Sequence, residues 1–321
     1  MSTKLNGTEP ILCAPLIRLV DRHLIALLAS LDTNEWDLPT IAPQWTVRDV
    51  AAHLLDTALR KLSMGRDKCH VESAPVRSHQ DVIALVNRLN REGVTVYRRL
   101  SPSVLTELMQ LACNQTADYY ESLDPFDSAA LGVSWAGEMT SLVWFDNARE
   151  LTERWHHQQQ IRLAVNRPGI MTPLLYHPVL DTFMRGLPHA YRDVAAPANT
   201  ALLVEISGDC GGQWCLVRSH HTWKFSSELP AHITAHIIIP QTIGWRSLRG
   251  RWILSPITNP GWNLLGWPRS AACGSSQSRS GSSGFWRRSR RRHGSRGRNT
   301  AAARFRIRIS SEIGRCPESG A

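Results

Sequence analysis

The sequence predicts an α+β fold in which a helical bundle comes first and a small mixed domain follows. Apolar residues recur at helical spacing through the first 195 residues, where polar, glycine or proline breaks separate the runs. Between residues 200 and 239 the pattern changes to β-branched residues and to alternation of apolar with polar residues, which is typical of strands. Helices joined by short loops indicate a bundle, and the later strands indicate a sheet that is added to it.

The first two expected helices carry the clearest local signals. Residues 16–31, LIRLVDRHLIALLASL, have apolar side chains at helical spacing, and the polar and proline residues that follow end the run. The second helix covers residues 45–65, WTVRDVAAHLLDTALRKLSMG. Thr46 is a natural N-cap there, and Asp49 follows three residues later, as in a capping box.

Four further helices are expected before the strands begin. The third covers about 80–100, and the fourth begins at Ser101 with proline in the next position, which suits a first helical turn. A long fifth helix covers about 139–165, and a sixth, at about 174–192, follows a break that contains proline and glycine.

The strands and the change of composition after them set the domain limits. Three strand-like stretches cover residues 200–208, 213–225 and 231–239, with glycine and proline turns between them. We therefore predict three parts, namely a bundle at residues 10–168, a small α+β domain at residues 169–246, and a disordered, low-complexity basic tail at residues 247–321.

The tail also holds all of the excess positive charge. The chain has a formal net charge of +10, which on its own suggests a nucleic-acid partner. Residues 247–321 contain 15 arginines, two glutamates and no lysine, whereas residues 1–246 have a net charge of −3. The body of the protein is mildly acidic, so a nucleic acid is not the partner that it predicts.

Two interpretations of the tail are open. As a selected sequence, it would be a disordered arm in which RRSRRRHGSRGR binds nucleic acid through phosphate contacts. Arginine without lysine, mixed with serine, glycine, proline and tryptophan, is also what a GC-rich gene encodes in a shifted reading frame. We favour a reading frame lost near Arg246, which would leave the small domain incomplete. A gene sequence with no insertion or deletion at that codon would refute this hypothesis.

Cysteine usage and hydropathy indicate the compartment. The seven cysteines are scattered, and no pair has the spacing of a zinc ribbon or a CxxC motif, so we expect reduced thiols in a cytoplasmic protein. The first ten residues lack the apolar stretch of a signal peptide, and no run of 18 apolar residues occurs. We expect no membrane association, and the sequence leaves the oligomeric state open.

The candidate chemistry lies in residues 150–162, ELTERWHHQQQIR. Glu153 and His157 are four residues apart, so they would share one face of a helix. His53 lies in the second expected helix, on the face that should turn inward. Two imidazoles and one carboxylate suit Zn²⁺ or a similar divalent metal. Three protein ligands also leave a position open, as in catalytic sites.

Spacing alone also allows simpler interpretations of the same residues. His53 could be a hydrogen-bonded core residue, and Glu153 with His157 could be a solvated pair on a helix surface. His156 is three residues from Glu153, so it could take the place of His157. The residues alone therefore leave the metal site and its histidine undecided.

A family resemblance adds to this evidence. QWTVRDVAAHLLD resembles a segment of the mycothiol-dependent maleylpyruvate isomerase family, which lies within the DinB-like helical-bundle superfamily, and TERWHHQQQIR resembles that family's second segment. The order of the segments, their separation of roughly a hundred residues and the later sheet region are also similar, over residues 10–246. The resemblance implies a DinB-like metal-binding bundle of four-helix type and a smaller sterol-carrier-like domain.

The resemblance also implies which residues form the site. Alignment on the final Ile-Arg pair of the second segment places two metal ligands at Glu153 and His157, and the first segment places the third at His53. Gln160 stands where the family commonly has aspartate, and it could orient a ligand, as could Asp56. Arg246 could bind an anionic substrate from the second domain.

The function that the resemblance implies is thiol-dependent catalysis on a small molecule. In the isomerase, a low-molecular-weight thiol such as mycothiol adds to the double bond of maleylpyruvate, rotation follows, and elimination gives fumarylpyruvate. A related thiol transferase would use the same metal ligands. Two other functions are open, namely a non-catalytic binder of a small or apolar ligand, and nucleic-acid binding through the tail.

Overall fold

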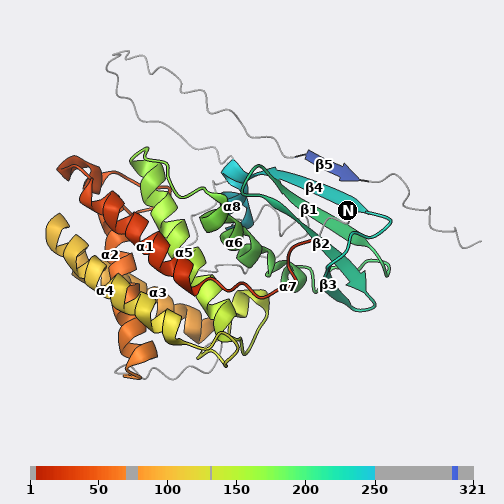
Figure 1. Ribbon diagram of the computed structural model, residues 1–321, viewed down its shortest axis with the longest axis horizontal. Coiled ribbons are helices and arrows are strands. Elements are labelled where there is room, and N and C mark those ends of the chain that lie inside the picture. Colours follow the sequence, from red (N-terminus) through yellow and green to blue (C-terminus); the bar gives the residue numbers. More distant parts are fainter. Residues whose placement is uncertain (1–4, 70–78, 131, 250–305, 310–321) are drawn as a thin grey trace, which may run out of the picture.

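The computed structural model describes residues 5–69, 79–130, 132–249 and 306–309. In these residues a helical bundle lies beside a sheet, and three later helices lie between the two (Figure 1). The helices are α1 Ala14–Ala29, α2 Val47–Arg60, α3 His79–Tyr97, α4 Pro102–Ser122, α5 Val143–Ala164, α6 Pro173–Met184, α7 Leu187–Ala190 and α8 Gln241–Arg249. The strands are β1 Ala201–Ser207, β2 Gly212–Ser219, β3 Thr222–Ser226, β4 Ala235–Pro240 and β5 Arg306–Ile309.

The bundle is built around α1, α2, α4 and α5. α1 packs against α4 and α5, while α2 packs against α3, α4 and α5. The predicted starts of two of these helices are confirmed: Thr46 and Asp49 form a reciprocal capping box at α2, and Ser101 caps α4 ahead of a proline. α2 continues into a π-helical turn at Lys61–Arg66, which we call η2.

The sheet has the strand order β3-β2-β1-β4-β5. β1 pairs with β2 in antiparallel and with β4 in parallel orientation, and β3 and β5 add antiparallel edges. α8 begins directly after β4 and packs against α6, β1 and β4. The α+β class predicted from the sequence is thus confirmed.

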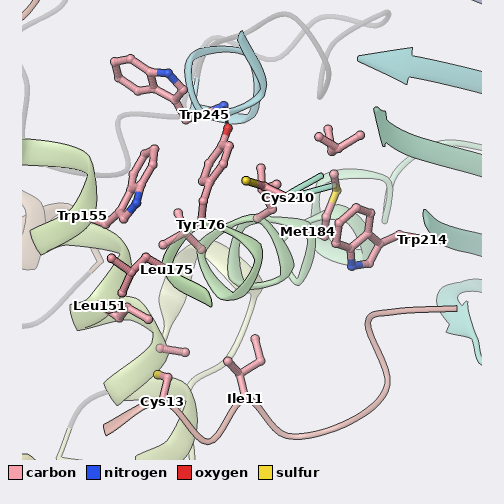
Figure 2. Packing of buried hydrophobic residues seen from close by; sticks show 14 of the residues in the cluster. Ile11, Cys13, Leu151, Trp155, Leu175, Tyr176, Met184, Cys210, Trp214 and Trp245 are labelled. Carbon is pink, nitrogen blue, oxygen red and sulfur yellow. Dashed lines mark hydrogen bonds between the residues drawn. The ribbon is translucent and has the colours of Figure 1, made fainter. Parts of the chain in front are cut away.

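One hydrophobic core joins the bundle to the sheet. Trp155 of α5 stacks on Tyr176 of α6, with ring centroids 4.5 Å apart and planes at 3°. Trp245 of α8 meets Trp155 edge to face at 6.2 Å, and Figure 2 shows the three rings together between the helices. The Tyr176 hydroxyl donates to Gln241 O at 2.9 Å and accepts from Trp245 N at 2.8 Å. These contacts fix α8 against the bundle side of the molecule.

The structure corrects several details of the prediction. The stretch predicted as a strand at 213–225 is a hairpin, because the chain turns at His220 and His221, and His220 adopts a positive φ of 47°. The helix predicted at 174–192 is divided into α6 and α7 around Gly186. α8 was not predicted, since its short sequence, QTIGWRSLR, follows a strand without a strong helix-start signal.

The predicted disordered tail contains one described strand. β5 pairs with β4, and its sequence RIRI alternates charged with β-branched residues, a pattern of period two that suits an edge strand. Residues 250–305 and 310–321 lie outside the described residues, so the remaining predictions about the tail are not addressed by the fold. No described helix is long and apolar enough to cross a membrane.

Candidate metal centre

α2 presents a histidine to the interior of the bundle. Thr46 Oγ1 accepts a hydrogen bond from Asp49 N at 3.3 Å, and Asp49 Oδ2 accepts one from Thr46 N at 3.0 Å, which fixes the start of the helix. His53 lies two turns further along, and only 6% of its surface is exposed. Trp45 directly precedes the cap, and its ring centroid lies 4.9 Å from that of His53. The cap therefore holds an indole against the imidazole.

α5 supplies the other residues, and it is buried on nearly all sides. One side of this helix contacts α1, another contacts α2, and a third contacts α6. Its polar run is therefore enclosed, although a solvated helix face was one interpretation of the sequence. His157 is 2% exposed, and its Nε2 lies 3.6 Å from Oε2 of Glu153, whose side chain is 18% exposed. The predicted pairing of these two residues on one helical face is confirmed.

The two helices bring their histidines together. The ring centroids of His53 and His157 are 4.7 Å apart, with the rings at 69° to each other. Trp45 borders both rings, since its centroid lies 6.3 Å from that of His157. Of the three residues that the family resemblance implies, His53 therefore adjoins His157, and Glu153 lies beside His157. Trp45 is a neighbour of both imidazoles that the sequence did not single out as part of the site.

The donor chemistry fits a divalent metal. Nitrogen and oxygen ligands at zinc distances are about 3.4 Å apart in a tetrahedral site, which is close to the 3.6 Å between His157 Nε2 and Glu153 Oε2. In the described parts of the chain, no group of three or more His, Cys, Asp or Glu side chains is arranged so that it could hold a metal ion. The ligand assignment therefore stays a prediction.

The geometry distinguishes residues that spacing left equivalent. The ring of His156 meets that of Trp245 of α8 edge to face at 5.1 Å. Glu150 Oε1 accepts a hydrogen bond from Arg149 Nη2 at 2.7 Å and lies 3.6 Å from Lys61 Nζ. His157 is thus the histidine of the motif whose ring meets that of His53 of α2, and Glu153 is the acid beside it.

Gln160 lies between the two adjacent histidines. Its Oε1 is 3.0 Å from His157 Nδ1, and its Nε2 is 2.9 Å from His156 Nε2. All three side chains belong to α5 and are buried. The Gln160 amide therefore contacts both His157, which borders α2, and His156, which borders α8.

The other predicted site residues lie further out. Asp56 accepts a hydrogen bond from Arg60 Nε at 2.8 Å, and it faces α3, where a Cβ on Gly93 would lie 2.2 Å from the Asp56 carboxyl carbon. Burial raises the pKa of Asp56, while the Arg60 guanidinium opposes that rise. Arg246 is exposed, and its guanidinium lies over the Trp245 ring at 5.0 Å.

A half-buried group of charges that the sequence did not indicate lies further toward the start of α5. This Lys61 cluster consists of Lys61, Asp146, Arg149 and Glu150, and Lys61 Nζ donates to Asp146 Oδ2 at 2.9 Å. Burial alone would raise the pKa values of Asp146 and Glu150, but Arg149 and Lys61 outweigh burial and lower both. Lys61 belongs to η2, and a π-helical turn gives no local sequence signal that would have predicted this contact.

Comparison with known proteins supports a family assignment for the bundle. Residues 17–162 match the family model described as the mycothiol maleylpyruvate isomerase N-terminal domain. The chain is similar to two solved structures, the mycothiol-dependent maleylpyruvate isomerase, with a TM-score of 0.45, and a histidine-to-alanine mutant of it, with a TM-score of 0.46. Both are 14% identical to this chain, and the match covers 74% of it and 88% of theirs. No curated protein matches the sequence.

Proposed function

Residues 17–162 belong to the mycothiol maleylpyruvate isomerase N-terminal domain family, and we propose that this chain is a metal-dependent enzyme that uses a low-molecular-weight thiol. His53, Glu153 and His157 would hold the metal, with Zn²⁺ as the expected ion. The observation that carries the proposal is the meeting of two buried imidazoles from α2 and α5, 4.7 Å apart, with a carboxylate beside one of them.

The residues present would each have a defined task. When bound, the metal would lower the pKa of a thiol or a water molecule and so supply a nucleophile at neutral pH. Trp45 excludes water from one side of both imidazoles, since its ring borders each of them. Gln160 would hold the His157 ring in place through its hydrogen bond to Nδ1. Three protein ligands would leave room for the thiol or the substrate.

The second domain would supply the group that binds the substrate. Arg246 is exposed on α8, and Trp245 beside it contacts His156. A guanidinium in this place suits a small substrate that carries a carboxylate, because it can form two parallel hydrogen bonds. We propose a cis–trans isomerisation through thiol addition and elimination, or transfer of the thiol, as the reaction class, with mycothiol as the first thiol to test.

Metal analysis of the full chain tests the proposal. The protein is stripped with a chelator, incubated with zinc, passed over a desalting column and analysed for bound metal. We expect close to one equivalent in the wild type and a loss of this metal in His157→Ala, because removal of one ligand from a three-ligand site abolishes tight binding. His221→Ala is the matched control, since His221 is exposed in the β2–β3 turn.

The outcomes separate the site from adventitious binding. Less than about half an equivalent in the wild type would refute the metal site. Equal loss of metal in His157→Ala and His221→Ala would show binding by surface histidines. A screen of thiols with cis-unsaturated carboxylates, with Arg246→Ala as the variant for substrate binding, then tests the reaction class.

A further inference from the structure

We propose that Gln160 fixes the tautomers of two adjacent histidines and thereby turns His157 Nε2 toward the metal site. In this arrangement His156 is a positioning residue that connects the site to α8. The inference deepens the proposed metal site and rests on it, but its first test is made on the protein without metal.

Hydrogen-bond chemistry sets the proton positions. Gln160 Oε1 can only accept a hydrogen bond, so the His157 nitrogen at 3.0 Å must be Nδ1–H. Gln160 Nε2 can only donate, so the His156 nitrogen at 2.9 Å must be an unprotonated Nε2. A neutral imidazole carries one N–H, so in its neutral form each of the two histidines takes the Nδ1–H tautomer. Only about 2% of each of these three side chains is exposed, so bulk solvent does not compete for these bonds.

A reversed amide would give the opposite tautomers, and the position of Glu153 argues against it. In that case His157 would carry its proton on Nε2, which lies 3.6 Å from Glu153 Oε2. This separation is too long for an N–H···O hydrogen bond. With the proton on Nδ1, Nε2 keeps its lone pair, and its 3.6 Å separation from the carboxylate oxygen is close to the spacing of two ligands of one cation.

His156 connects this amide to the second domain. Its ring meets the Trp245 ring edge to face at 5.1 Å and 72°. The backbone N–H of Trp245 donates to the Tyr176 hydroxyl at 2.8 Å, and the Tyr176 ring stacks on Trp155. α8 is therefore held on the bundle by a continuous set of contacts, and its indole restricts the rotation of the His156 ring.

The choice of glutamine at this position has a specific consequence. A carboxylate can only accept hydrogen bonds, so it would require an N–H from each of the two histidines. The glutamine amide accepts from His157 and donates to His156. His157 therefore takes the same Nδ1–H tautomer with Gln160 as it would with a carboxylate. His156 takes the Nδ1–H tautomer with Gln160, whereas a carboxylate would require the Nε2–H tautomer.

Nitrogen NMR of the metal-free full chain is the first test. With ¹⁵N-labelled histidine, the two ring nitrogens report which one carries the proton, and His156→Ala and His157→Ala assign the signals. We expect Nδ1–H for both residues in the wild type. In Gln160→Glu, His157 should keep Nδ1–H and His156 should change to Nε2–H, whereas Gln160→Leu should give mixtures at both.

Metal affinity is the second readout. Loss of a side chain that orients a metal-bound histidine weakens metal binding by roughly 10–100-fold, and we expect this loss for Gln160→Leu in competition with a zinc chelator. Gln160→Glu retains the acceptor for His157 Nδ1, so its affinity should stay within about threefold of the wild type, as a conservative rescue. The visible spectrum of the cobalt-loaded protein should change in Gln160→Leu and not in Gln160→Glu.

The outcomes distinguish the inference from the function on which it rests. An Nε2–H tautomer of His157 in the metal-free wild type overturns the inference, as does an unchanged zinc affinity in Gln160→Leu. A wild type that binds no zinc overturns both the metal site and the role assigned to Gln160 in it, even if the tautomers are as expected. Both Nδ1–H tautomers, with the weakened affinity in Gln160→Leu and its rescue in Gln160→Glu, support the full proposal.

Discussion

α5 buries two polar faces, and the buried polar side chains of the two faces are paired in different ways. Toward α1 and α4, Arg154 Nη1 donates to Asp21 Oδ2 at 2.5 Å and Nη2 donates to Thr116 Oγ1 at 3.1 Å. Toward α2 and α8, the helix presents His156 and His157, held by one glutamine amide. The first face is made of charges that neutralise one another, and the second is made of two imidazole rings that contact one amide side chain.

The difference indicates which buried polar groups serve the fold and which serve chemistry. A buried guanidinium must be paired, because an uncompensated charge in the interior costs several kcal/mol. An imidazole can be held by a neutral amide and still offer a nitrogen to a metal. Changes on the arginine face should therefore alter stability, and changes on the histidine face should alter metal binding more than stability.

The largest effect is expected from breaking the ion pair on the arginine face. Arg154→Met leaves the Asp21 carboxylate buried without its partner, and both side chains are less than 10% exposed. We expect a loss of about 3–5 kcal/mol in the free energy of unfolding, measured by urea denaturation. The double variant Asp21→Leu with Arg154→Met removes both charges and should recover most of that loss. Equal stabilities of the single and double variants would contradict this view of the face.

A smaller loss is expected at the Lys61 cluster, with a pH dependence. Lys61→Met removes a donor from Asp146 and a charge beside Glu150, which should cost about 1–3 kcal/mol at pH 7. Both carboxylates have lowered pKa values in the fold, so their contribution is present above the ordinary values of 3.8 and 4.5 and is lost as the pH falls below them. The cost of Lys61→Met should therefore be smaller at pH 3 than at pH 7. An equal loss of unfolding free energy at pH 3 and pH 7 would show that the charges of Asp146 and Glu150 do not stabilise the fold through Lys61.

A still smaller loss of stability is expected when the contact between α8 and the bundle is weakened. Tyr176→Phe removes the hydroxyl that donates to Gln241 O and accepts from Trp245 N, but it keeps the ring that stacks on Trp155. We expect a loss of about 1–2 kcal/mol. If α8 positions His156 as inferred, this variant should also lower zinc affinity, whereas Lys61→Met should leave zinc affinity unchanged. If instead Lys61→Met lowered zinc affinity and Tyr176→Phe did not, the inference that α8 positions His156 would be wrong.

The smallest change in the free energy of unfolding is expected at Gln158, and it should be neutral or stabilising rather than destabilising. Its side chain is completely buried, and among the described residues neither atom of its amide has a hydrogen-bond partner. Gln158→Met keeps the length of the side chain and removes the desolvated amide, so it should be neutral or stabilise the fold by up to about 1 kcal/mol. Two residues away, Gln160→Met should lower zinc affinity. A strong destabilisation by Gln158→Met would show that its amide has a partner.

The sequence predicted most where the signals are local. The capping box of Thr46 with Asp49 and the start of α4 at Ser101 depend only on neighbouring residues, and both are confirmed. The hairpin turn at His220 and His221 divides a stretch that was predicted as one strand, because neither residue belongs to the types that favour a positive φ most strongly. α8 was missed because its helix is stabilised by packing on α6 and on the sheet rather than by its own sequence.

The site was predictable in its parts and not in its surroundings. Helical spacing places Glu153 with His157, and the family resemblance adds His53, yet neither shows that His156 faces Trp245 from a helix almost ninety residues later. A solvated face was a reasonable interpretation of the polar run in α5. The fold excludes it, since α1, α2 and α6 enclose that helix. Such long-range contacts follow from the tertiary packing and leave no periodic signal in the sequence.

The most direct test of the central claim is the location of the metal. A crystal of the full chain grown with zinc can be measured on both sides of the zinc absorption edge, so that the anomalous difference marks the ion. The account predicts one strong peak within bonding distance of His53, Glu153 and His157, with Gln160 still on His157 Nδ1. A peak held by His156, or none between α2 and α5 in a zinc-saturated crystal, would contradict it.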